Sequence, residues 1–191
     1  MNKDKKILMV LGGCLLTGFV CAAIVFAAIG FFLVSTPSMD GGFGDTKQAD
    51  YLDQPAPLFT TTTLDGTSWS LEDQRGKVIL IDFWASWCGP CIQAMPHLRK
   101  IHTKYGDRED FVMIGVSVDD YRGNLLRSID KHDVTWEQLF EEGMGWENSV
   151  ARLYEVDGIP HVLIVDQEGV IRAYDPAGRQ IDRALEELLG V

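Results

Sequence analysis

The pattern of hydrophobic and polar residues divides the chain into a long apolar run near the N-terminus and a later region with regular strand and helix patterns. Residues 7–34 form 28 consecutive uncharged, mostly apolar positions, more than the roughly 20 that a helix needs to cross the hydrocarbon core of a bilayer. Lysines precede this run at positions 3, 5 and 6, and acidic residues follow it. The positive-inside bias therefore predicts a cytoplasmic N-terminus, with everything after the run on the outer face of the membrane.

A cleaved signal peptide is the main alternative for this segment. Signal peptides have apolar regions of about 7–15 residues and a small-x-small cleavage site, whereas this run is longer and contains no good Ala-x-Ala. Leu11-Gly12-Gly13-Cys14 loosely resembles a lipoprotein cleavage box, but only five apolar residues precede it. We therefore predict an uncleaved anchor, and leave cleavage or lipidation at Cys14 as the alternative.

Beyond the apolar run the composition changes twice. Residues 36–54 are rich in Gly, Pro, Ser and Asp and show no apolar period, which is typical of a flexible linker. Regular patterns begin at residue 55. We therefore expect a cytoplasmic stub and anchor over residues 1–35, a linker over 36–54 and a globular domain over 55–191.

Within the domain, segments of period two and short apolar runs alternate with segments of helical spacing. The pattern predicts a β-hairpin at 57–62 and 67–70 on the turn Asp65-Gly66, strands at 78–83, 111–118, 161–165 and 170–174, and helices at 88–105, 124–132, 147–154 and 181–189. The connection over 135–145 has no clear pattern. Strands that alternate with helices predict an α/β layered sheet.

The charge and the cysteine content of the chain exclude some classes of partner and fold. Three of the 17 basic and one of the 28 acidic residues lie before residue 36, so the remainder carries 14 basic and 27 acidic residues. Such an acidic domain repels nucleic acid and anionic lipid, and we expect no nucleic-acid partner. Only two of the four cysteines lie in the domain, which excludes a disulfide-stapled scaffold.

Both of these cysteines stand in the sequence Trp87-Cys88-Gly89-Pro90-Cys91, where a strand pattern runs into a helical one. A cysteine at a helix N-terminus has a lowered pKa, because the backbone N–H groups favour the thiolate. Cys88 is therefore the expected nucleophile, and Cys91, one turn further, would resolve the mixed disulfide. Gly89 and Pro90 shape the tight helix entry, since proline needs no N–H donor in the first turn.

Two structural interpretations of the cysteine pair are weaker. A permanent disulfide across so short a loop would gain little chain entropy. A zinc site completed by His97 and His102 would place all four ligands on one helix, whereas a zinc finger needs a longer gap between its ligand pairs.

Asp82 is the one acid in the apolar strand before the cysteines. Burial should raise its pKa, and an acid beneath the dithiol can accept the proton of Cys91 during exchange. The alternative is an acid that faces solvent at a sheet edge, which the apolar neighbours Ile81 and Phe83 disfavour. We expect Trp84 and Trp87 to pack around the dithiol and shield it.

These motifs together resemble the membrane-anchored TlpA-like thiol-disulfide oxidoreductases of bacteria. The resemblance rests on Pro55-x-Pro57-x-Phe59, Leu64-Asp65-Gly66, Gly76-Lys77-Val78, Phe83-Trp84-Ala85-Ser86-Trp87-Cys88, Gly115-Val116-Ser117, Gly158-Ile159-Pro160 and Asp166-x-x-Gly169. It implies a thioredoxin-like α/β fold with an added N-terminal β-hairpin and a central insertion, preceded by one transmembrane helix.

The resemblance also implies particular roles. Pro160 would be cis and pack against the dithiol, and the Ile159 backbone would pair with the client chain. The redox-active Cys88–Cys91 disulfide would be the only cofactor. Anchored in the bacterial cytoplasmic membrane, the domain would act on the periplasmic side, reducing disulfide-bearing client proteins such as apocytochrome c and receiving electrons from a membrane-embedded thiol donor.

The direction of electron flow rests on the dipeptide Gly89-Pro90. The same dipeptide occurs in thioredoxin, whose potential of about −270 mV is reducing, against about −120 mV for the oxidant DsbA. We expect a reductase, and keep a thiol oxidase or isomerase as the alternative. A second alternative is Cu(I) delivery by Cys88, Cys91 and His161, since two thiols and an imidazole suit that ion; His161 could equally be a strand-edge residue.

Overall fold

The computed structural model of the protein describes residues 50–191. The predicted anchor at residues 7–34 and nearly all of the predicted linker lie outside the described residues. Within residues 50–191 no helix has the length and apolar character needed to span a membrane.

A five-stranded sheet forms the centre of the domain, in the order β5-β4-β3-β6-β7. The strands are β3 (Val78–Trp84), β4 (Phe111–Ser117), β5 (Glu137–Phe140), β6 (His161–Val165) and β7 (Ile171–Tyr174). β3, β4 and β5 run parallel, whereas β6 runs antiparallel to β3, and β7 antiparallel to β6. The carboxyl ends of the three parallel strands therefore meet at one edge of the sheet.

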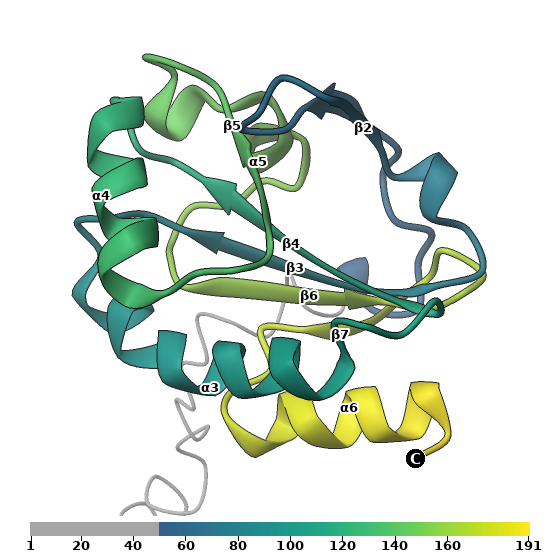
Figure 1. Ribbon diagram of the computed structural model, residues 1–191. Helices are drawn as coiled ribbons and strands as arrows, with labels where there is room; N and C mark the ends of the chain where they lie inside the picture. Colours follow the sequence, from purple (N-terminus) through teal and green to yellow (C-terminus); the bar gives the residue numbers. More distant parts are fainter. Residues whose placement is uncertain (1–49) are drawn as a thin grey trace, which may run out of the picture. The chain divides into compact units, whose positions relative to one another are not determined.

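Helices cover both faces of this sheet (Figure 1). The helices are α3 (Gly89–Tyr105), α4 (Arg122–His132), α5 (Ser149–Leu153) and α6 (Arg179–Leu189), with short 3₁₀ turns η1 (Glu72–Gln74) and η2 (Gly145–Glu147). Figure 1 shows α3 and α6 side by side beneath the sheet and α5 above it. Ion pairs join the two lower helices: Lys104 Nζ lies 3.2 Å from Glu186 Oε1.

Two short strands, β1 (Thr60–Thr62) and β2 (Ser68–Ser70), form a separate antiparallel pair. The turn between them uses Gly66 at φ +90°, a left-handed conformation that glycine adopts at no steric cost. The pair is attached to the central sheet through one bridge between Thr63 and Leu139 of β5.

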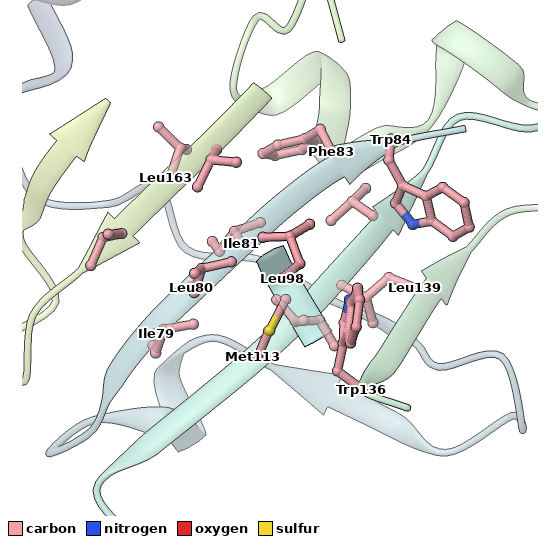
Figure 2. Packing of buried hydrophobic residues seen from close by; sticks show 14 of the residues in the cluster. Ile79, Leu80, Ile81, Phe83, Trp84, Leu98, Met113, Trp136, Leu139 and Leu163 are labelled. Atoms are coloured by element: carbon pink, nitrogen blue, oxygen red, sulfur yellow. The ribbon is translucent and has the colours of Figure 1, made fainter. Parts of the chain in front are cut away.

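β3 organises the core because all seven of its residues are buried. Successive side chains of a strand point to opposite faces, so Ile81 and Phe83 face α5 while Leu80 and Trp84 face α3. Figure 2 shows these side chains packed with those of the neighbouring strands and of α3. Burial on both faces fixes the register of β3, and β3 in turn fixes where the following helix begins.

The expected strands and α-helices appear with shifts of one to two residues at most ends, and one strand is new. The segment without a clear pattern contains β5, which pairs in parallel with β4 from Ile114↔Glu137 to Ser117↔Phe140. Its four residues include a glutamate and a glutamine, so it lacks a strand's apolar pattern. Tertiary pairing, and not local preference, makes it a strand.

Candidate active site

Cys88 and Cys91 are joined in a disulfide at the start of α3. Cys88 is the N-cap of the helix, with extended backbone angles, and its Sγ accepts a hydrogen bond from the Cys91 N–H at 3.2 Å. Pro90 stands in the first turn. The pair thus lies at the strand-to-helix junction, as predicted, and the free N–H groups of the helix end point toward Cys88.

The two cysteines of the disulfide are buried, whereas the residues beside them are exposed. Cys88 is 4% and Cys91 1% exposed, whereas Gly89 and Pro90 are exposed. Trp87 is 55% exposed, so it flanks the disulfide without covering it completely. A client can therefore approach Cys88 from the side of these three residues.

Asp119 supports the loop before the cysteines and was not identified from the sequence. Its carboxylate, 1% exposed, accepts hydrogen bonds from the Ser86 N–H at 2.9 Å, the Ser86 hydroxyl at 2.5 Å and the Ser117 hydroxyl at 2.9 Å. It thereby ties the end of β3 to the end of β4. An acid directly after a buried strand, at the edge where the dithiol lies, was the signal available in the sequence.

Asp82 is buried in the middle of the sheet, 1% exposed, so the solvent-facing alternative is wrong. Burial raises the pKa of its carboxyl to about 7, because no opposite charge compensates for the lost hydration. Its Oδ2 has no hydrogen-bond partner among the described residues. Asp82 also lines a cavity of about 770 Å³ together with Leu98 and Pro160.

The residues that line this cavity show that Asp82 lies on the same side of α3 as Cys91. Ala94 and Leu98 line the cavity, and Cys91 precedes them by three and seven residues, a spacing that places all three on one face of a helix. Asp82, whose carboxyl has a pKa of about 7, therefore lies on the face of α3 that carries Cys91, next to a cavity large enough for water.

Pro160 lies at the start of β6, and the Ile159–Pro160 peptide bond is cis, as the resemblance implied. The proline lines the same cavity as Asp82, and Ile159 packs against the hydrophobic core while remaining partly exposed. Pairing of the Ile159 backbone with a client stays a prediction.

His161 is the first residue of β6 and is buried. Its Nδ1 lies 2.8 Å from Asp175 Oδ1, and its ring packs against Tyr174 and Phe83 with centroid distances of 4.7 and 5.5 Å. Because His161 pairs with Phe83 across β3 and β6, its side chain shares the face of Phe83. Asp82, one position earlier on β3, points to the other face.

The metal sites considered from the sequence are not formed. Among residues 50–191 no three His, Cys, Asp or Glu side chains gather as a metal site, so neither Cys88 and Cys91 with His161 nor the zinc set comes together. His97 pairs instead with Asp182 of α6 at 3.0 Å, and His102 with Thr135 at 2.9 Å. The side chains of His97, His102 and His161 are thus each bonded within the fold.

Residues 52–174 match the AhpC/TSA family. The chain belongs to this family. Similar curated proteins include the thioredoxin-like protein YneN of Bacillus subtilis, 33% identical over 62% of this chain and 68% of that protein. The thiol-disulfide oxidoreductase ResA of Bacillus cereus is 25% identical over 87% of this chain and 89% of that protein.

Solved structures agree with this assignment. The thioredoxin domain of a thiol-disulfide oxidoreductase from Bacteroides vulgatus is 31% identical with a TM-score of 0.64, covering 71% of this chain and 96% of that one. A thiol-disulfide oxidoreductase from Bacteroides fragilis is 29% identical with a TM-score of 0.65, covering 71% and 99%. The domain therefore has a thioredoxin-like α/β fold, and the protein is an enzyme, a thiol-disulfide oxidoreductase.

Proposed function

We propose that the protein reduces disulfides of client proteins on the outer side of the bacterial cytoplasmic membrane, through the Cys88–Cys91 pair. The observation that carries the proposal is the geometry at the start of α3. A cysteine caps the helix, and Asp82, whose burial raises its pKa to about 7, lines a cavity together with Ala94 and Leu98 of the same helix.

The reaction proceeds by two thiol–disulfide exchanges. In the reduced enzyme the Cys88 thiolate attacks one sulfur of the client disulfide, and the client's other sulfur leaves as a thiolate and takes up a proton. Cys91 then attacks Cys88 Sγ, which releases the second client thiol and re-forms the Cys88–Cys91 disulfide. Two electrons pass from the enzyme to the client, so the enzyme must be reduced again by a thiol donor.

Asp82 accepts the proton that Cys91 must lose before it attacks. A base is most effective when its pKa lies near the working pH, and burial places that of Asp82 at about 7. The adjoining cavity allows water to carry the proton to solvent. We expect Asp82→Asn to slow exchange near neutral pH while the fold persists. Unchanged exchange kinetics from pH 6 to pH 9 would remove Asp82 from the mechanism.

The direction and location of the reaction complete the proposal. The Gly89-Pro90 dipeptide supports a reductase, and the long apolar run after three lysines supports a single-pass anchor with the domain in the periplasm. A reductase in an oxidising compartment requires electrons from across the membrane, so we place a membrane-embedded thiol protein as its donor. We include apocytochrome c, before haem attachment, among its clients.

The redox potential tests the direction. At equilibrium with dithiothreitol or glutathione, the full-length protein should show a potential nearer the −270 mV of thioredoxin than the −120 mV of DsbA. The two values differ by about 7 kcal/mol for a two-electron exchange and are easily separated. A potential above about −180 mV, the level of protein disulfide isomerase, would replace the reductase by a thiol oxidase or isomerase.

The client is identified by arresting the reaction halfway. Cys91→Ala leaves Cys88 unable to release the mixed disulfide, so the client stays covalently attached. Membranes from cells that express this variant should yield the client after non-reducing purification and release by dithiothreitol. The matched control is Cys88→Ala, which lacks the attacking sulfur and should capture nothing.

A further inference from the structure

Large exposed apolar side chains are concentrated at the edge of the sheet where the dithiol lies. Eight such residues occur in the described part of the chain, and four of them come from the loops at the carboxyl ends of β3, β4 and β5. These four are Trp87, Tyr121, Met144 and Trp146, which we call the aromatic edge. Figure 1 shows the strand ends from which their loops begin.

The loops that carry these four side chains lie against one another. The rings of Trp87 and Trp146 lie 6.2 Å apart between centroids. Asp120, next to Tyr121, accepts a backbone hydrogen bond from the Gly143 N–H at 2.8 Å. A side chain at Gly145 would collide with the Asp120 carboxylate, so the turn that carries Trp146 sits directly on the loop that carries Tyr121.

The turn is held firmly although its tryptophan is exposed. Asn148 caps α5 by accepting the Val150 and Ala151 N–H groups at 3.0 and 3.1 Å, and Glu141 accepts the Ser149 N–H at 2.8 Å. Trp146 is nevertheless 41% exposed. A fixed backbone that presents large aromatic side chains to solvent is typical of a binding surface.

The charges around the aromatic edge are mostly negative. Segments 119–122 and 141–147 contain five acidic residues and one arginine, and Arg122 is already bonded to the Leu64 carbonyl. A partner therefore gains from lysine or arginine near its apolar contacts. Anionic lipid is disfavoured by the same charges, although a tryptophan-rich surface could also lie against a membrane.

We propose that the aromatic edge selects clients, and that Trp146 is its specificity-determining residue. The occupant is an extended client segment with an aromatic or branched aliphatic side chain beside its disulfide cysteine and a basic residue nearby. The apolar side chain packs against Trp87 and Trp146 while the cysteine reaches Cys88. This inference rests on the proposed reductase activity.

The test compares two peptides of equal length, each with one cysteine linked to glutathione. In one peptide the cysteine is flanked by tryptophan and lysine, and in the other by serine and glutamate. The reduced full-length protein should release glutathione from the first peptide about tenfold faster. Trp146→Ala should reduce this preference to about twofold or less, and Trp146→Phe should retain most of it.

The control is Leu153→Ala, because Leu153 of α5 is also 41% exposed but lies outside the aromatic edge; it should keep the full preference. If the wild type reduces both peptides equally, or Trp146→Ala keeps the preference, the inference is wrong although the reductase stands. If the wild type reduces neither peptide nor oxidised glutathione, the proposed function itself fails. A blue shift of tryptophan emission with phosphatidylcholine vesicles, absent in Trp146→Ala, would assign the surface to the membrane instead.

Discussion

Replacing Asp82 by asparagine should stabilise the fold, by an amount that increases with pH. Burial raises the pKa of Asp82 to about 7 from the ordinary 3.8. In the unfolded chain the carboxyl ionises near the ordinary value, so between pH 3.8 and pH 7 folding requires it to take up a proton. The contribution of protonated Asp82 to the free energy of unfolding is fully present below pH 3.8 and is lost as the pH rises through about 7.

The size of the effect follows from the two pKa values. They differ by about three pH units, and each unit corresponds to about 1.4 kcal/mol. The wild type therefore loses up to about 4 kcal/mol of its free energy of unfolding between pH 3.8 and pH 7, and no more above pH 7. Asparagine has nearly the same shape but does not ionise, so the variant avoids this loss.

Urea denaturation of the oxidised protein, followed by tryptophan fluorescence, measures the difference. The advantage of Asp82→Asn over the wild type should be about 3 kcal/mol larger at pH 8.5 than at pH 4.5. Asp65→Asn is a control of opposite sign, because the Thr63 hydroxyl lowers the pKa of Asp65. The wild type should be more stable than Asp65→Asn when the pH lies above the ordinary pKa of aspartate. It should lose that advantage as the pH falls through the lowered pKa of Asp65. An Asp82→Asn difference that does not change with pH would refute the reasoning.

Three further outcomes are expected. In the reduced protein, substoichiometric iodoacetamide should label Cys88 first, because Cys88 caps α3; a label found mainly on Cys91 by mass mapping would reverse the two roles. Gln138→Ala should lower the free energy of unfolding by about 1–3 kcal/mol, since the buried Trp84 Nε1–H, 2.8 Å from Gln138 Oε1, would lose its acceptor; unchanged urea midpoints would contradict this. Asn148→Ala should cost about 1 kcal/mol through the lost cap of α5, and equal stability would show that water replaces the side chain.

Much of the site could be predicted because local pattern and chemistry agree there. The strand at Val78–Trp84 is apolar almost throughout, and a fully buried strand requires such a run. The apolar neighbours of the one acid within it favoured burial of that acid, and a proline two residues after Cys88 is typical of a helix start. The cis bond before Pro160 could not be predicted from the local pattern, because a proline at a strand start is compatible with either isomer. Only the family resemblance implied the cis form.

Other features depend on contacts between distant segments, which a pattern does not contain. His161 was considered as a third metal ligand beside the two cysteines, but the two-residue period of β6 turns its side chain to the face opposite Asp82. Asp119 acts through Ser86, 33 positions earlier. The pairing of Trp87 with Trp146 joins segments nearly 60 positions apart.

The position of Trp146 follows from how β5 attaches to the sheet. Gln138 of β5 lies opposite Gly115 of β4, and its amide fills the space that a side chain at Gly115 would occupy. The same amide accepts the Nε1–H of Trp84, at the end of β3. Glycine at 115 therefore lets the added strand dock closely beside the strand that leads to Cys88. The turn after β5 is then carried to the edge where the dithiol lies, and the strand that lacked a pattern in the sequence is the one that brings Trp146 to the active site.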